Sequence, residues 1–316
     1  MSSVPSRAPS SRVTSFAQMA GDIKLAHSVF ALPFAVFGAF LAGFAGRSAM
    51  PWPRFLGILA LVIACMVLAR TWAMLVNRLL DRGIDAKNPR TARRVFAAGA
   101  VSAARGWAVA SACAAGFVLV CAAFDYFFAN RWPLILSVPV LAWLAFYSIT
   151  KRFTALCHVV LGVALALSPL AAAIAVRPAA LGSTPALWWT AAFVTMWVAG
   201  FDVIYSLQDE QFDRGAGLSS IPVALGSRGA AWIARVLHVL AIASLLACWT
   251  STPKLGPIFG GAILAVVLLL TVEHAVLVTS FRGGGTRRPG LHMVFFTLNG
   301  VLSCLVGAMG CLDLLF

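Results

Sequence analysis

The sequence predicts an all-α membrane protein, a bundle of about nine transmembrane helices with its N-terminus in the cytosol. Composition is the first reason, because 61% of the 316 residues are hydrophobic and only 11% are charged. Ordinary globular chains are about half apolar and about a quarter charged. A water-soluble fold of this size has too little interior for so much apolar surface, so lipid must cover much of it. The second reason is the order along the chain, in which long apolar runs alternate with short basic loops.

A transmembrane helix needs about 20 consecutive apolar residues. Nine runs meet this requirement, at residues 26–46, 55–77, 105–128, 133–150, 155–176, 187–205, 229–250, 256–280 and 291–311. Residues 21–316 are therefore expected to form one transmembrane domain. Residues 1–20 are rich in Ser and Arg and lack an apolar core, which predicts a disordered cytosolic tail and excludes a secretory signal.

The basic residues predict the orientation of the bundle. If the N-terminus is cytosolic and the spans alternate, 17 of the 24 Lys and Arg residues fall on the cytosolic side and five on the other, while Arg70 and Arg235 lie within spans. This excess is the positive-inside pattern of membrane proteins. It also explains the net charge of +14 without a nucleic-acid partner.

Acidic residues are rare, and their positions are informative. Six of the ten lie in two segments, namely Asp81, Asp85, Asp202, Asp209, Glu210 and Asp213. Both segments fall at cytosolic ends of spans in the predicted topology. Carboxylates near lipid are costly and repel one another, so a divalent cation or nearby arginines must offset the cost.

The first segment predicts half of a metal site. Asn77, Asp81 and Asp85 are spaced i, i+4, i+8, which places their side chains on one face of a helix. Carboxylate and amide oxygens suit Mg²⁺, an ion usually shared with substrate phosphates. Arg70 lies on the same stripe, one to two turns deeper, and is a candidate for contact with the substrate and for catalysis. The alternatives are a solvated helix end and an Arg70 paired with a carboxylate of a neighbouring helix.

Basic residues follow both this segment and the fourth apolar run. Those around the first segment are expected to bind phosphate oxygens, and they are Arg78, Arg82, Lys87, Arg90, Arg93 and Arg94. Tyr147, Lys151 and Arg152 end the fourth run and would approach a diphosphate from the side opposite the metals. An ordinary positive-inside anchor is the alternative reading of this second group.

The second acidic segment predicts the other half of the site. Asp202, Tyr205, Asp209 and Asp213 follow one another at helical steps of three, four and four. Tyr205 and Gln208 are candidates for substrate binding, although Tyr205 also suits a membrane interface. The run Arg214-Gly-Ala-Gly217 is expected to end the helix. Two facing DxxxD pairs predict two Mg²⁺ ions that bridge a diphosphate.

These segments resemble the UbiA superfamily of intramembrane prenyltransferases, and the resemblance covers nearly the whole chain. It rests on NxxxDxxxD at residues 77–85, DxxxD at residues 209–213 and the Tyr-x-x-x-Lys-Arg run at residues 147–152. In detail the chain is similar to a bacterial branch of 4-hydroxybenzoate or menaquinone-pathway polyprenyltransferases. It departs from that branch at Phe96, where FAAGAVS replaces the usual Pro-Ala-Gly-Arg.

The resemblance implies Mg²⁺-dependent transfer of a polyprenyl group from polyprenyl diphosphate to an aromatic acceptor. The acceptor would be 4-hydroxybenzoate-like or a menaquinone precursor, in quinone biosynthesis at the bacterial inner membrane, with the site facing the cytosol. Asp81, Asp85, Asp209 and Asp213 would bind the metal and neutralise the leaving diphosphate. Asp202 or Asp81 would act as the base, and Arg70 would hold an acceptor carboxylate or a phosphate oxygen.

Two other classes of membrane protein also use carboxylates. An ion-coupled transporter would carry them near the bilayer midplane in broken helices, whereas here they lie at helix ends. A CDP-alcohol phosphotransferase would pack its aspartates into one short D-G-x-x-A-R segment, a pattern that Arg82-Gly83-Ile84-Asp85 does not match. Both classes remain alternatives on the sequence alone.

Overall fold

A computed structural model of the chain describes residues 19, 30–46, 48–282 and 291–316. Every regular element in these ranges is a helix. The all-α prediction is therefore confirmed. Apart from Met19, the predicted N-terminal tail lies outside the described residues, so the division of the chain at residue 20 stays a prediction.

Nine apolar helices correspond one to one with the nine predicted runs. They are α2 (Leu32–Phe44), α3 (Trp52–Leu80), α5 (Ala103–Phe128), α6 (Trp132–Thr150), α7 (Cys157–Val176), α9 (Ala186–Ser206), α11 (Ile221–Thr250), α12 (Pro257–Arg282) and α13 (Leu291–Leu315). Eight of the spans are long and apolar enough to cross a membrane. The first, α2, has 13 described residues, and positions 26–29 of its predicted run lie outside the described part. The chain is an integral membrane protein.

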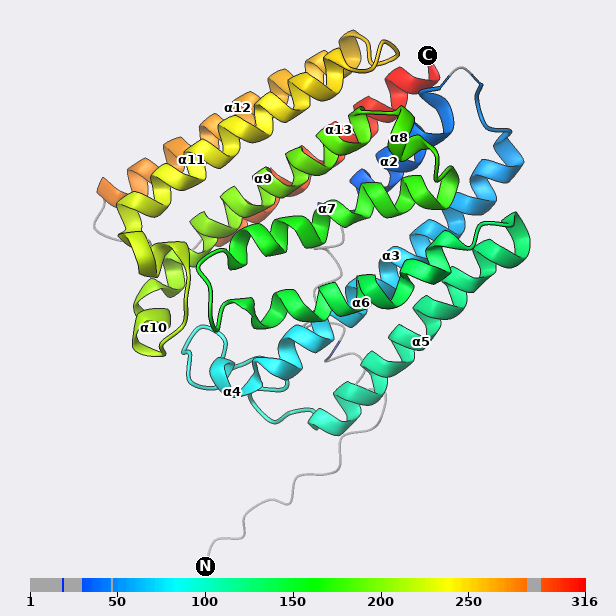
Figure 1. Cartoon of the computed structure of the whole chain (residues 1–316). Helices are drawn as coiled ribbons and strands as arrows, with labels where there is room; N and C mark the ends of the chain where they lie inside the picture. The colour runs from blue at the N-terminus through cyan, green and yellow to red at the C-terminus, as the bar shows by residue number, and fades with distance from the viewer. Residues whose placement is uncertain (1–18, 20–29, 47, 283–290) are drawn as a thin grey trace, which may run out of the picture.

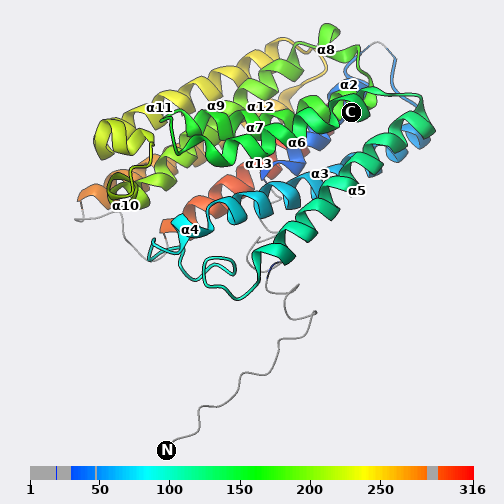
Figure 2. The same ribbon diagram turned by 60° about the horizontal axis from the view of Figure 1, so that its bottom comes forward.

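Figure 1 shows how the helices are arranged in one bundle. Helix α9 packs most extensively against α11 and α7, while α2 lies against α7 and α13. Helices α3, α5 and α6 form the opposite side, as the turned view in Figure 2 also shows. The short helices α4 (Arg82–Asp85) and α10 (Glu210–Gly215) lie at one end of the bundle, and α8 (Ala180–Ser183) and the C-terminus lie at the other (Figure 1).

Small residues bring the central helices into close contact. A Cβ atom added at Gly162 of α7 would lie 2.3 Å from the carbonyl oxygen of Thr195 on α9. At Gly38 of α2, an added Cβ would meet the carbonyl oxygen of Pro169 at the same distance. Such close approach of helix backbones is typical of membrane bundles, where van der Waals packing drives helix association.

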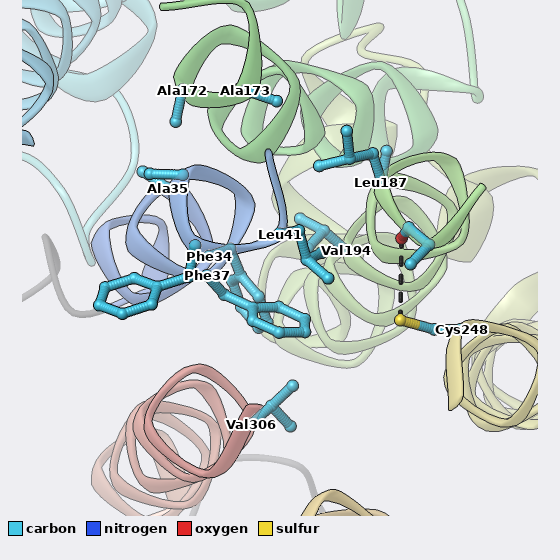
Figure 3. Packing of buried hydrophobic residues seen from close by; sticks show 14 of the residues in the cluster. Phe34, Ala35, Phe37, Leu41, Ala172, Ala173, Leu187, Val194, Cys248 and Val306 are labelled. Atoms are coloured by element: carbon cyan, nitrogen blue, oxygen red, sulfur yellow. Dashed lines mark hydrogen bonds between the residues drawn. The ribbon is translucent and has the colours of Figure 1, made fainter. Parts of the chain in front are cut away.

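The core gathers around α2, which is covered by helices on several sides. Figure 3 shows Phe34 and Phe37 of α2 together with Val194 of α9 and Val306 of α13 in one buried cluster. The four side chains are fully buried. This core lies behind the end of the bundle that carries the acidic segments and fixes the helices from which they project.

The structure corrects the prediction that Asn77, Asp81 and Asp85 share one continuous helix. Helix α3 ends at Leu80, three residues beyond the predicted apolar run, and Asp81 caps it with φ −91° and ψ 2°. The chain then makes the single turn of α4, in which Gly83 weakens helix propagation. The break turns Asp85 inward, where it is 6% exposed.

The second acidic segment is not one regular α-helix either, although its four predicted residues still face one space. Helix α9 ends at Ser206, the 3₁₀ turn η2 (Leu207–Asp209) follows, and α10 carries Asp213. A 3₁₀ turn is tighter than an α-helix and changes the direction of the side chains after it. The predicted break after Asp213 is confirmed, because α10 ends at Gly215 and Gly217 has φ +68°.

Candidate active site

A polar cavity of about 720 Å³ opens at the end of the bundle that carries α4 and α10. Both acidic segments and the turn after α6 line it. The predicted site residues around this cavity are Arg70, Asn77, Arg78, Asp81, Asp85, Tyr147, Lys151, Arg152, Asp202, Tyr205, Gln208, Asp209 and Asp213. The predicted basic residues Arg90, Arg93 and Arg94 also line it, whereas Arg82 and Lys87 are the exceptions among the predicted residues. Both lie beyond the helix break, are exposed and do not line the cavity.

Asp81 is held between α3 and the turn after α6. Its Oδ1 accepts a hydrogen bond from Arg152 Nη2 at 3.1 Å, and its Oδ2 accepts one from Asn77 Nδ2 at 3.3 Å. Asn77 Oδ1 in turn accepts from Arg78 Nη1 at 3.2 Å. Burial raises the pKa of Asp81 above its ordinary value, and the hydrogen bond from Arg152 offsets only part of that shift.

Asp85 is paired with a cation from its own loop. Arg94 Nη1 lies 2.7 Å from Asp85 Oδ1 and 2.8 Å from Oδ2. The Thr91 hydroxyl donates to the backbone carbonyl of Asp85 at 3.1 Å. The loop between α4 and α5 therefore folds back over the end of the first acidic segment.

Asp209 accepts three hydrogen bonds, the most of the four predicted metal carboxylates. Arg90 donates through Nε at 2.9 Å and also through Nη2, and Asn88 Nδ2 donates at 3.1 Å. The remaining Nη1 of Arg90 donates to the Tyr205 hydroxyl at 2.8 Å. Burial lowers the pKa of Arg90, but the hydrogen bond and charge of Asp209 more than offset it, so the pKa lies above its ordinary value. The loop after the first segment thus reaches the second segment.

Asp213 is the fourth of the predicted metal carboxylates. Its Oδ2 lies 2.8 Å from Lys151 Nζ, with the Asp213 side chain 1% exposed. Burial lowers the pKa of Lys151 and the charge of Asp213 raises it, with a net rise. Lys151 and Arg152 therefore contact the carboxylates directly, which corrects the prediction that they lie on the side opposite them. Each side chain follows a helix end and reaches across to a different acidic segment.

The arrangement fits Mg²⁺ shared with a diphosphate better than a closed protein cage. Among the described residues, no three His, Cys, Asp or Glu side chains converge at metal-binding distance. Mg²⁺ commonly takes only one or two carboxylates, several waters and the phosphates of its substrate. Asp81 and Asp85 offer one such pair, and Asp209 and Asp213 offer the other. Binding of the ion would exchange the Arg and Lys partners of these carboxylates for the metal, and the released cations would be available for phosphate oxygens.

A second cavity, of about 510 Å³, adjoins the first and is lined almost entirely by apolar side chains. Arg70 and Tyr147 border both cavities. Along α6 the apolar lining runs from Tyr147 to Pro133, about 21 Å at the rise of an α-helix. Arg70 Nε is buried without a hydrogen-bond partner in the described part of the chain, and no carboxylate there pairs with the guanidinium. The alternative in which Arg70 pairs with a neighbouring helix is therefore wrong for the described residues.

Among the polar residues of the site that were not predicted from the sequence, two contact predicted carboxylates through their side chains. Asn88 holds Asp209, and His158 Nδ1 lies 2.6 Å from Asp202 Oδ2. Asn88 lies among the predicted basic residues of the loop, and this position is the one signal in the sequence that could have identified it. His158 stands alone at the start of an apolar run, and nothing in its spacing connects it with Asp202.

The chain is similar to known proteins over most of its length. The model of the UbiA prenyltransferase family matches residues 31–307. A 4-hydroxybenzoate octaprenyltransferase of Nitrosomonas europaea is 30% identical over 269 residues, which cover 84% of this chain and 85% of the relative. The enzyme of the same name from Paracidovorax citrulli is 31% identical over 247 residues, which cover 76% and 79%.

Solved structures of the same fold exist. A UbiA homolog from Aeropyrum pernix K1 superposes with a TM-score of 0.77 at 32% identity, over 91% of this chain and 98% of the other. A UbiA homolog from Archaeoglobus fulgidus bound to GPP and Mg²⁺ superposes with a TM-score of 0.68 at 17% identity, over 95% and 100%. At 17% identity, the similarity to the Archaeoglobus fulgidus protein shows a shared fold and nothing more.

Proposed function

The chain belongs to the UbiA prenyltransferase family, and we propose that it transfers a polyprenyl group from polyprenyl diphosphate to an aromatic acceptor. The acceptor would be 4-hydroxybenzoate or a related aromatic precursor of menaquinone, such as a naphthoate. One observation carries the proposal: four carboxylates and their basic partners line a polar cavity that continues past Arg70 and Tyr147 into an apolar cavity. A substrate with an anionic head and a long apolar tail suits that pair of cavities.

The donor would lie across the boundary between the two cavities. Its diphosphate would bind in the polar cavity, where Lys151, Arg152 and Arg90 carry the positive charge. The polyprenyl tail would extend into the apolar cavity between α3, α6 and α7. C1 of the donor would then lie near Arg70 and Tyr147, which border both spaces.

Mg²⁺ would be held by Asp81, Asp85, Asp209 and Asp213, with Asn77 beside Asp81, as two ions bound together with the diphosphate. When bound, the metal neutralises the negative charge that builds up on the leaving diphosphate. The carboxylates at the end of α3, in α4, in η2 and in α10 would supply the oxygen donors, and Arg152, Arg94 and Lys151 would bind the phosphate oxygens.

The protein's own residues then control the organic step. The C1–O bond breaks, the diphosphate leaves with the electron pair, and the apolar cavity excludes water from the allylic cation. The aromatic ring attacks C1 with its π electrons, and the carboxylate of Asp202 accepts the ring proton. Arg70, a partly buried cation whose Nε has no hydrogen-bond partner in the described residues, would bind the acceptor carboxylate. Tyr205 and Gln208 line the polar cavity and would contact the acceptor.

We place this reaction in quinone biosynthesis at the cytoplasmic membrane of a bacterium, with the polar cavity open to the cytosol. The support is the excess of Lys and Arg at the end of the bundle that carries the cavity. At the cytosolic face the cavity would receive soluble acceptors and Mg²⁺ from the cell interior. The apolar cavity would receive a lipid-soluble donor.

The proposal is tested by reconstituting the purified chain in liposomes with radiolabelled polyprenyl diphosphate. Reactions would contain 4-hydroxybenzoate, a hydroxynaphthoate or no acceptor, and extracted lipids would be analysed by mass spectrometry. The expected product is a prenylated aromatic acid that forms with one acceptor class and not without an acceptor. Absence of any prenylated product, or uptake of an ion without transfer, would contradict the proposal.

A further inference from the structure

A histidine that plays no part in the steps above lies directly behind Asp202. His158 is in the first turn of α7, and its side chain is 3% exposed against 25% for that of Asp202. The distance from His158 Nδ1 to Asp202 Oδ2 is 2.6 Å. Both residues line the polar cavity, with Asp202 the more open of the two to it.

The other ring nitrogen of His158 determines which tautomer is present. The backbone N–H of Ile221 donates to His158 Nε2 at 3.4 Å. Ile221 is the first residue of α11, where a helix leaves its N–H groups without an intrahelical acceptor. A peptide N–H can only donate, so Nε2 must be the unprotonated nitrogen. The ring proton is then on Nδ1, and His158 donates it to Asp202.

Asp202 therefore has one engaged oxygen and one available oxygen. Oδ2 accepts from His158, whereas Oδ1 has no hydrogen bond to any residue within the described ranges. A carboxylate that accepts a short hydrogen bond from a ring N–H keeps a fixed orientation. Because α7, α9 and the start of α11 all contribute to the arrangement, the direction of Oδ1 is set by three elements.

We propose that His158 is a positioning residue for this reaction: it holds Asp202 as an oriented carboxylate whose Oδ1 takes the proton from the acceptor ring. This inference rests on the proposed function. When the new bond joins C1 to the ring carbon, the electrons of the ring C–H bond return to the ring and its proton passes to Oδ1. Asp202 later releases that proton to solvent at the open end of the cavity. His158 keeps its own proton throughout, as an orienting partner of a base does.

The experiment compares variants that keep or remove the donor behind Asp202. His158→Gln keeps an N–H donor for Asp202 and an oxygen acceptor on a polar side chain of similar length. His158→Leu removes both. We expect kcat to fall about 10- to 100-fold in His158→Leu, with an unchanged KM for the donor, and to fall less than about threefold in His158→Gln. Asp202→Asn is expected to lower kcat by about 10²- to 10⁴-fold.

A double-mutant cycle separates positioning from a general structural role. If His158 acts only through Asp202, the variant carrying both His158→Leu and Asp202→Asn will have the kcat of Asp202→Asn alone. Thermal unfolding in detergent checks that each variant is folded. If His158→Leu does not fold, His158→Met replaces it, since its unbranched side chain fills irregular space.

Two results would overturn the inference while leaving the proposed function intact. One is a double variant whose losses multiply, and the other is a His158→Gln variant as slow as His158→Leu. A wild-type chain that transfers no prenyl group to any acceptor would instead overturn the proposed function, and this inference with it. The two failures are therefore distinguishable.

Discussion

At the scale of single residues, the site is a set of carboxylates that each have a cationic partner. Asp81 pairs with Arg152, Asp85 with Arg94, Asp209 with Arg90 and Asp213 with Lys151. Burial of an unpaired carboxylate costs several kcal/mol, so these pairs allow the acidic segments to lie at the membrane surface. The same side chains supply the two charges that a metal diphosphate needs, negative for the ion and positive for the phosphates.

A substitution of Arg90 tests whether the cationic partner of a carboxylate also binds the diphosphate. Its guanidinium contacts Asp209 and Tyr205 and lies 5.2 Å from the Tyr205 ring centroid. Arg90→Leu is expected to raise the KM for polyprenyl diphosphate by about tenfold or more, because a charge-assisted contact of about 1.5–3 kcal/mol is lost. Steady-state kinetics at saturating acceptor measure the effect. Arg105→Leu, on the exposed start of α5, is the control, and equal effects of the two changes would contradict the assignment.

Substitution of Arg70 is expected to impair activity without lowering stability. A guanidinium at membrane depth with a buried Nε and no carboxylate partner among the described residues is costly to the fold. We therefore expect Arg70→Leu to unfold at an equal or higher temperature than the wild type, while the KM for the acceptor rises about tenfold or more. Thermal unfolding in detergent and acceptor titrations measure the two effects. A variant that is both less stable and fully active would refute the substrate-binding role.

At the scale of helices, close packing places the site residues. Gly162 of α7 touches the backbone of α9 at Thr195, one turn from His158 and about two turns from Asp202. The contact therefore sets the distance between the helices that carry this pair. It depends on the absence of a side chain at residue 162.

Gly162→Val is expected to force α7 and α9 apart. Overpacking of a tight contact typically costs about 1–3 kcal/mol, and the unfolding temperature should fall accordingly. Transfer activity should fall as well, because His158 and Asp202 would separate. Gly182→Val is the matched control, since a Cβ at Gly182 meets nothing within 4 Å. The two variants unfolding at the same temperature would show that the contact is not tight.

Element boundaries also show where sequence reasoning stops. A regular spacing of Asn77, Asp81 and Asp85 predicted one helical face, but the chain breaks at Asp81. Periodicity identifies residues that belong together and cannot show a local change of φ and ψ. The Gly215–Gly217 break was predictable, because glycine has a known local effect.

At the scale of the whole molecule, hydropathy was sufficient to find the nine apolar helices of the described residues. A long apolar run in lipid forms a helix, because a helix satisfies the backbone hydrogen bonds within the segment itself. Charged residues are rare in such a chain and were therefore informative: all predicted site residues except Arg82 and Lys87 line one cavity. The partner of each carboxylate was not predictable. It depends on how loops after different helices fold across the end of the bundle, and so does the contact between His158 and Asp202.

Orientation in the membrane is the prediction that belongs to this scale. In a background without the seven native cysteines, Arg82→Cys and Ser183→Cys place single thiols at opposite ends of the bundle. A membrane-impermeant thiol reagent added to intact cells should label Ser183→Cys only, and lysed cells should show both, because Lys and Arg are expected to remain cytosolic. Labelling of Arg82→Cys in intact cells would reverse the proposed topology.

The most direct test of the whole account is the metal dependence of transfer by the purified chain, measured as radiolabel moved from polyprenyl diphosphate to the aromatic acid. We expect turnover with Mg²⁺, none in excess EDTA and recovery with Mn²⁺. Asp209→Asn should lose at least about 10²-fold in turnover. Glu210→Gln, a change of the neighbouring carboxylate that does not line the cavity, should stay near the wild type. Undiminished turnover in chelator, or an Asp209→Asn variant as fast as the wild type, would contradict the account.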